Sequence, residues 1–138
     1  QLIRIDANDN VVWQREWQLT PTGSPCLIAN DALFDPDGSV YVGGYALQNG
    51  NSDGYLCKID AAGNMIWSQH GYGFDIIEKL DSSTTGQLTA FASAYAEAWI
   101  IKFDSAGTAM QSRNYTVATS NCPQTQNVHP TSSGGFRL

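Results

Sequence analysis

One short pattern occurs three times in this sequence, and it constrains the fold more than any other feature. It consists of an apolar stretch with one basic residue, a turn that opens with Asp, and a second apolar stretch. The copies read LIRIDANDNVVW at residues 2–13, YLCKIDAAGNMIW at residues 55–67 and WIIKFDSAGTAMQ at residues 99–111. Asp at the start of a turn and Gly where positive φ is needed are typical of β-hairpins. We therefore expect a hairpin at each copy, within a fold of repeated units.

A second marker recurs between these hairpins. A turn glycine returns every 48 residues, at Gly38, Gly86 and Gly134, whereas the Asp of the hairpins is spaced by 54 and then 44 residues. We expect the difference to lie in the loop before the third strand, which is long at residues 47–53 and reduced to Ala96 in the next unit. Fixed turns with loops of variable length are typical of repeated supersecondary units.

Each complete unit contains four expected strands. They are residues 27–34, 39–46, 54–60 and 64–70 in one unit, and residues 75–80, 87–95, 98–104 and 108–115 in the next. The third strand is apolar on both faces except for its basic residue, as in a sheet that neighbours cover on both sides. Four such strands in about 48 residues are the pattern of a β-propeller blade.

The sequence therefore predicts an all-β chain, a partial or assembled β-propeller. Its single segment, residues 1–138, divides into a half blade at 1–17, blades at 26–71 and 74–115, and the start of a further blade at 122–138. A propeller typically needs 4–8 blades to close. Because the sequence starts at Gln1 and ends within an expected strand, we expect a longer chain to complete the ring. Identical subunits are the alternative, with two chains supplying six blades.

The units resemble the propeller repeats of large secreted or cell-surface bacterial proteins. That repeat reads roughly DGG-Y-hydrophobic-x-G, followed by K-hydrophobic-D-x-x-G-N-x-x-W. The matching residues are Asp37, Gly38, Tyr41, Gly43 and Gly44, then Lys58, Asp60, Gly63, Asn64 and Trp67, and again Gly134, Gly135 and Phe136. The middle unit departs from the pattern with Thr85-Gly86-Gln87 at its turn and Gln111 in place of Trp. The resemblance implies the fold and a secreted or surface location, but no activity, because the repeat is a scaffold.

Charge and hydropathy exclude some classes of binding partner. With 13 acidic and 7 basic residues the formal net charge is -6, which argues against a nucleic-acid partner. No apolar run reaches the length of a membrane span. We therefore expect a protein or glycan partner, no nucleic acid and no membrane span.

No motif of a known active site occurs, and we expect no enzyme activity, catalytic residue or cofactor. Asp31, Asp75 and Glu78 lie in first strands near the expected central funnel. They occupy non-equivalent positions and are insufficient for catalysis. His70 and His129 lie in different columns of the repeat, so we expect no metal site between them.

The recurring charged residues have structural interpretations. Asp6, Asp60 and Asp104 are expected to cap their own turns rather than bind calcium, and so is the DPDG turn at residues 35–38. A basic residue recurs at Arg4, Lys58 and Lys102. In an otherwise apolar strand such a charge must be paired or reach solvent, and we expect pairing rather than an anion site.

Trp13 and Trp67 share a column, and we expect them to pack between blades rather than to stack on sugars. Cys57 takes an apolar column and is expected to be a buried thiol. Cys26 and Cys122 lie 96 residues apart at equivalent places, and whether they are bridged stays open.

These observations favour a non-enzymatic scaffold or binding module of an extracellular or cell-surface protein. A carbohydrate-binding lectin assembled from several chains is the alternative. A propeller enzyme is less favoured, since it would need convergent carboxylates or a cofactor in the funnel.

Overall fold

The computed structural model describes residues 1–17, 26–48, 51–71, 73–82, 87–94, 97–116, 129–130 and 136–137. Every regular element in these ranges is a β-strand, so the prediction of an all-β chain is confirmed. None of the described residues belongs to a helix that could cross a membrane.

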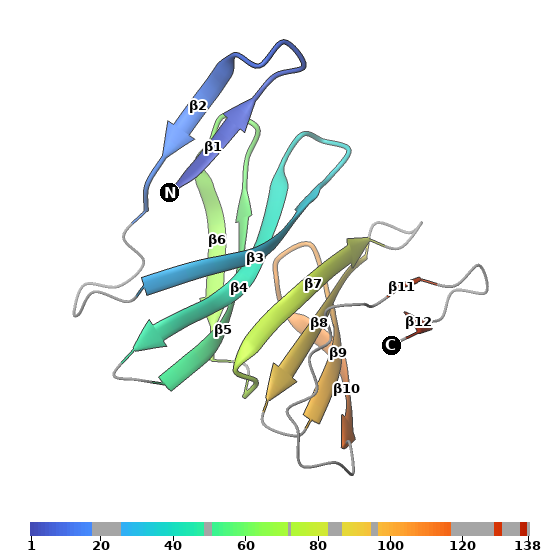
Figure 1. Ribbon diagram of the computed structural model, residues 1–138. Coiled ribbons are helices and arrows are strands. Elements are labelled where there is room, and N and C mark those ends of the chain that lie inside the picture. The colour runs from blue at the N-terminus through green and yellow to red at the C-terminus, as the bar shows by residue number, and fades with distance from the viewer. Residues whose placement is uncertain are drawn as a thin grey trace.

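All strand pairs are antiparallel, and within each sheet the strands pair in the order of the sequence. The strands are β1 (Leu2–Ile5), β2 (Val11–Arg15), β3 (Cys26–Phe34), β4 (Val40–Gln48), β5 (Asn51–Ile59), β6 (Met65–His70), β7 (Ile76–Ser82), β8 (Leu88–Ala94), β9 (Glu97–Phe103), β10 (Ala109–Thr116), β11 (His129–Pro130) and β12 (Phe136–Arg137). We call β1–β2 the N-terminal hairpin, β3–β6 the first sheet, β7–β10 the second sheet and β11–β12 the C-terminal hairpin. Figure 1 shows the two sheets beside each other, with the two hairpins on opposite sides of the molecule.

Hairpins between first and second strands share one register. Their closing pairs lie 48 residues apart along the chain: Phe34–Val40, Ser82–Leu88 and Pro130–Phe136. Gly38 occupies its turn with a φ of +83°, a conformation that glycine adopts without steric cost. Gly86 and Gly134, predicted to be equivalent to Gly38, lie outside the described residues.

Hairpins between third and fourth strands also share one register. Their closing pairs are Ile5–Val11, Ile59–Met65 and Phe103–Ala109. Each is followed by one unpaired residue, at Val12, Ile66 and Met110, and then by the pairs Arg4–Trp13, Lys58–Trp67 and Lys102–Gln111. The residues that were aligned in sequence therefore take equivalent places in the sheets.

The prediction of a long loop at residues 47–53 is wrong. β4 and β5 have nine residues each, whereas β8 and β9 have seven. Leu47 pairs with Ser52 and Gln48 with Asn51, so these residues extend the hairpin. The spacing difference therefore comes from longer strands, because backbone pairing continues through polar residues as readily as through apolar ones.

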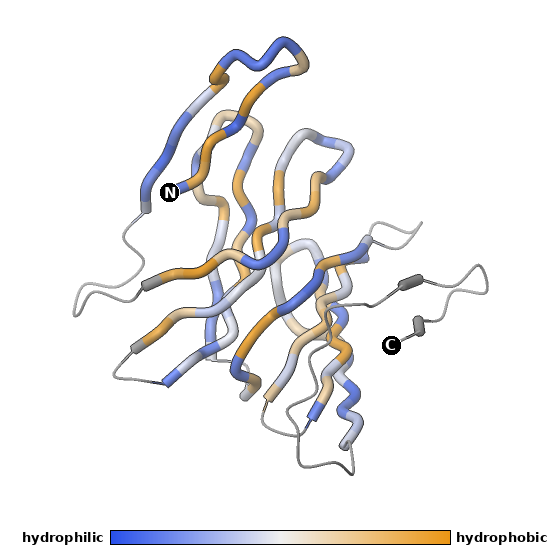
Figure 2. The backbone as a smooth tube through the Cα atoms, in the orientation of Figure 1, coloured by the Kyte–Doolittle hydropathy of each residue, from blue (hydrophilic) through white to orange (hydrophobic). Residues whose placement is uncertain are grey.

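Two apolar cores lie on opposite faces of the first sheet. Val40 and Val42 face the N-terminal hairpin, while Tyr41 between them faces the second sheet. This alternation follows from strand geometry. Figure 2 shows hydrophobic segments along strands of both sheets. Such four-stranded antiparallel sheets are compatible with blade-like units, and the described residues show no closed propeller.

Candidate functional site

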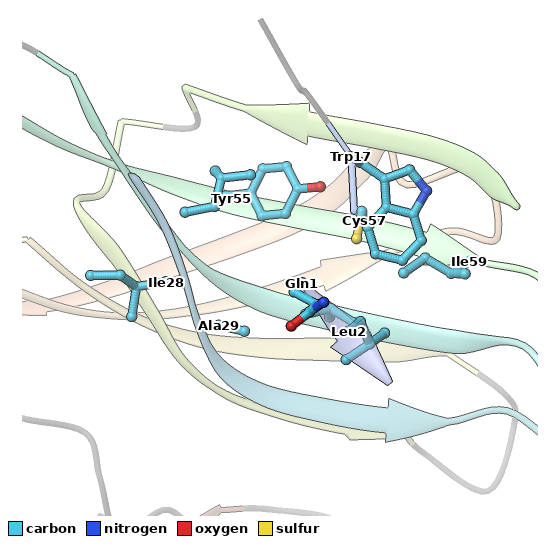
Figure 3. Close-up of a pocket in the computed structure, with 10 residues that line it drawn as sticks. Gln1, Leu2, Trp17, Ile28, Ala29, Tyr55, Cys57 and Ile59 are labelled. Atoms are coloured by element: carbon cyan, nitrogen blue, oxygen red, sulfur yellow. The ribbon is translucent and has the colours of Figure 1, made fainter. Parts of the chain in front are cut away.

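A cavity of about 130 Å³ lies between the N-terminal hairpin and the first sheet. Figure 3 shows it from close by. Its walls include Leu2 and Trp17 on the hairpin side and Leu27, Val42, Cys57 and Ile59 from the first sheet.

Strand geometry places these side chains. Tyr55, Cys57 and Ile59 alternate along β5 and therefore point to one face, where Val42 of β4 joins them. All four are buried. Trp17 follows β2 and packs edge-on against Trp13, with ring centroids 6.4 Å apart. The cavity is thus a gap in an apolar core rather than a polar cleft.

Besides Gln1, the polar groups that line the cavity are the Tyr55 hydroxyl and the Cys57 thiol, and both are protonated at neutral pH. Burial raises the pKa of the Tyr55 hydroxyl far above its usual range, and burial also raises the pKa of the Cys57 thiol. The Tyr55 hydroxyl is buried without a nitrogen or oxygen partner among the described residues; its interaction is with the thiol of Cys57. Neither group is a nucleophile or a base in this state, and most of the cavity wall is apolar. The prediction of a buried Cys57 is confirmed.

The two equivalent tryptophans make one recurring contact. Trp13 Nε1 donates a hydrogen bond to the carbonyl of Ala61 at 3.0 Å, and Trp67 Nε1 donates to the carbonyl of Ser105 at 3.1 Å. Ala61 and Ser105 both follow the turn Asp of the next unit. Trp13 is buried, and Trp67 is half-buried and packs against the core between the two sheets.

The recurring aspartates cap turns as predicted. Oδ1 of Asp6, Asp60 and Asp104 accepts hydrogen bonds from the backbone N–H groups two and four residues later. These bonds, with the Asn side chain four residues on, lower the pKa of Asp6 and Asp60. The described residues include no cluster of three potential metal ligands.

In the DPDG turn at residues 35–38, one aspartate caps the turn and the other pairs with a lysine. Asp37 Oδ1 accepts bonds from the Ser39 N–H at 2.8 Å and from its hydroxyl. Asp35 instead faces Lys58, whose Nζ lies 3.0 Å from Asp35 Oδ2 and 3.0 Å from the Tyr41 hydroxyl. The expected pairing of the basic column is therefore confirmed for Lys58.

The other two members of the basic column differ. Arg4 donates to the carbonyls of Gly38 and Ala61, at 3.0 and 3.1 Å, rather than to a carboxylate. Lys102 forms no ion pair with any described residue, so the expected pairing is wrong there. Lys58 pairs with Asp35, whereas the residue 48 positions after Asp35 is the uncharged Ser83, and the position opposite Lys102 carries Thr89 where Tyr41 stands opposite Lys58.

The carboxylates expected near a funnel are used in strand contacts. Asp31 accepts a bond from the Leu80 N–H at 2.8 Å and lies 3.6 Å from Lys79 Nζ. Glu78 accepts from the Ser93 hydroxyl at 3.0 Å. Asp75 donates its backbone N–H to the Ser93 carbonyl. They do not converge on one point.

Sequence reasoning missed Asn30. Its side-chain amide donates to the Ile77 carbonyl at 2.8 Å and joins β3 to β7. Asn30 is unpaired in a β-bulge, and Glu78, 48 residues later, is unpaired in the equivalent bulge. The shared 48-residue spacing could have shown that the two positions correspond, but no local sequence signal marks a bulge.

Several predicted candidates have no place in this site. His70 is exposed at the end of β6. The side chains of Cys26 and His129, and the whole of Cys122, lie outside what the structure describes. No protein-family model matches the chain, and no curated protein is significantly similar to it.

Proposed function

We propose that this chain is a β-propeller segment that serves as a non-enzymatic scaffold or binding module of an extracellular or cell-surface protein. The observation that carries the proposal is the recurring contact from Trp13 to Ala61 and from Trp67 to Ser105. Each unit thereby packs on the next in the same way. Repeated packing of four-stranded units about one direction is how propeller blades succeed one another.

The polar groups support a binding role over catalysis. Asp31 and Glu78 hold strands together through hydrogen bonds, and the hydroxyl and thiol in the cavity stay protonated. Proton transfer needs a group whose pKa lies near the working pH and which can reach substrate. The cavity offers apolar contact instead.

A protein partner is favoured over a glycan. The indole Nε1 groups of Trp13 and Trp67 are engaged by turns, so these rings are not free platforms for sugars. The unpaired residues at the outer-strand bulges, Val12, Ile66 and Met110, are instead 54%, 53% and 63% exposed. An exposed apolar residue at the same place in each unit forms a row suited to protein contact.

The proposal is tested on the native protein, isolated from its source with an antibody against this segment. Electron microscopy should show a ring-shaped particle with a central channel, and fractionation should place it outside the cell or on its surface. A glycan array should give no specific binding. Recovery from the cytosol, or particles without a ring, would overturn the proposal, and selective glycan binding would favour the lectin alternative.

A further inference from the structure

A second cavity, of about 220 Å³, lies on the second sheet and differs in chemistry from the apolar one. Its walls come from two adjacent strands, with Ile100 and Lys102 on β9 and Gln111, Arg113 and Tyr115 on β10. Lys102 pairs with Gln111, and Ile100 pairs with Arg113. Residues paired across strands, and residues two apart along one strand, point to the same face of a sheet. The two cations therefore share one face with an amide, a phenol and an aliphatic side chain.

Neither cation at this cavity is neutralised by an acidic side chain. All 13 acidic residues of the chain lie in the described ranges, and none of them forms an ion pair with Lys102 or Arg113. By contrast, Lys58, the equivalent of Lys102 in the first sheet, lies 3.0 Å from Asp35. Two neighbouring cations repel each other unless an anion lies close to both. The cavity therefore favours a negatively charged ligand.

The residues of this face also differ from those by which the first sheet packs on the second. Gln111 has the place of Trp67, whose indole bonds to a turn of the next unit. Arg113 has the place of the uncharged Gln69. The face lacks the aromatic ring of that packing contact and carries one more cation. This is a difference in residue type, and it holds whatever precedes or follows these strands.

An open strand edge lies beside the cavity. β10 is the outer strand of the second sheet, and none of the described strands pairs with its outer side (Figure 1). It pairs with β9 without a bulge from Gln111 to Thr116, and all of its side chains are exposed. Its outward backbone N–H and C=O groups can therefore pair with an added strand. A residue of that strand placed opposite Arg113 would point to the face of the cavity.

We propose that the cavity and the edge of β10 together bind an extended acidic segment of a partner protein. The segment pairs with residues 111–116, and acidic side chains at alternate positions, opposite Gln111 and Arg113, enter the cavity. The planar guanidinium of Arg113 donates two parallel hydrogen bonds to one carboxylate, and Lys102 adds a second positive charge.

Two features separate this ligand from other anions and from the surface described above. A peptide is favoured over an acidic glycan, because a peptide backbone supplies the regular donors and acceptors that a strand edge requires. The segment belongs to the protein partner proposed above, but it binds away from the row of Val12, Ile66 and Met110. Either proposal can therefore fail without the other.

Calorimetric titration of the protein with a synthetic peptide of alternating Glu and Val gives the first test. We expect one peptide to bind per chain, and the affinity should fall as salt is added, because salt screens exposed charges. The control peptide has Gln in place of Glu and keeps the same backbone and length. It should bind roughly tenfold more weakly or not at all.

Variants that remove one charge locate the site. Arg113→Gln and Lys102→Gln should each weaken the binding of the Glu–Val peptide roughly tenfold, the usual effect of losing one charged hydrogen bond. Arg15→Gln is the matched control, because Arg15 has the place of Arg113 in the N-terminal hairpin and is also exposed. It should leave the affinity unchanged. Circular dichroism confirms that each variant stays folded, and the comparison of the two peptides needs no variant at all.

Hydrogen exchange tests the strand pairing. The Glu–Val peptide should slow the exchange of backbone amides in β10, because its outward N–H groups become hydrogen-bonded. The amides of β6, the outer strand of the first sheet, are the internal control and should exchange as before.

Any of five results would overturn the proposal. They are no binding of the Glu–Val peptide, equal binding of the Gln–Val peptide, an equal loss of affinity in Arg15→Gln, unchanged exchange in β10, and tighter binding of a uronic acid polymer than of the peptide. The last result would assign the cavity to an acidic glycan. None of them bears on the propeller architecture, which fails separately if the native particle has no ring.

Discussion

The indole Nε1 of Trp67 lies 3.1 Å from the carbonyl oxygen of Ser105, which is 38 residues later in the chain. The same ring covers Gly107, where a Cβ would come within 2.8 Å of it. One side chain thus joins the outer strand of the first sheet to a turn of the second. Trp13 likewise donates to the Ala61 carbonyl and covers Gly63. The contact therefore recurs between successive units, and we call it the joint.

The hydrogen bond and the ring should contribute separately to this joint. Trp67→Phe keeps most of the apolar contact and should lower the free energy of unfolding by about 1 kcal/mol, the usual net value of one hydrogen bond. Trp67→Ala should cost about 3 kcal/mol, the low end for a truncated aromatic residue, because the ring is half-buried. Denaturant unfolding measures both, with exposed Ser68→Ala on the same strand as control. An equal cost for the two variants would assign the whole effect to the indole N–H.

Alanine substitutions at two glycines can separate the cost of a steric clash from the cost of a strained backbone. Gly107 and Gly71 have nearly the same φ, +80° and +78°, but a Cβ at Gly71 would meet nothing within 4 Å. Gly71→Ala should therefore cost only the left-handed conformation, about 1 kcal/mol. Gly107→Ala should cost clearly more, since Trp67 must move. Equal changes in unfolding free energy would mean that the ring adjusts freely.

Lys58 should give the protein an alkaline stability limit. Burial by itself would lower its pKa, but hydrogen bonds with Tyr41 and Asp35 outweigh burial and raise it. A raised pKa means that the folded state holds the proton more tightly. The resulting stability is complete below the ordinary pKa of 10.5 and is lost as the pH rises through the folded value. Lys58→Met should flatten this decline.

The same pair can be measured at neutral pH by a double-mutant cycle. Lys58→Met alone should cost about 2 kcal/mol, because it leaves the Asp35 carboxylate without its charged hydrogen bond. Lys58→Met combined with Asp35→Asn should cost less than the sum of the two single changes. Additive costs would show that the ion pair contributes nothing of its own.

The thiol of Cys57 should be inert in the folded protein. It is 2% exposed, and burial raises its pKa, so little thiolate forms at pH 8. In the Cys26→Ser, Cys122→Ser background, an aromatic disulfide reagent should react with Cys57 only at the rate of unfolding. Rapid labelling under native conditions would mean that the cavity beside Tyr55 opens readily to the reagent.

Sequence could predict most of the sheet register, because the turns that set it have strong local signals. Asp60 must accept backbone bonds and Gly63 must take positive φ, and both requirements restrict residue type. The same logic located Lys58 and its need for a partner. It failed at Lys102, because the acidic partner of Lys58 is Asp35, and the residue 48 positions later is the uncharged Ser83.

The candidate site could not be predicted. Trp67 bonds to a carbonyl, and any residue at position 105 supplies one, so the sequence carries no sign of the contact. The cavity beside Ala29 depends on how the N-terminal hairpin and the first sheet lie against each other, which is a property of the assembled sheets. The strand pairing between residues 47–48 and 51–53 has no clear signal, because the polar composition of this stretch is equally typical of a loop, although the sequence Asn49-Gly50 favours a tight hairpin turn.

The paired extension of β4 and β5 also limits how such a unit can change in length. Leu47–Ser52 and Gln48–Asn51 add two rungs beyond Ala46–Asp53, the pair equivalent to Ala94–Glu97. Every rung needs one residue on each strand, so growth in steps of two leaves the pairs below unchanged. An odd insertion would force a new bulge or a different turn. Paired growth of these two strands therefore changes both by the same number of residues.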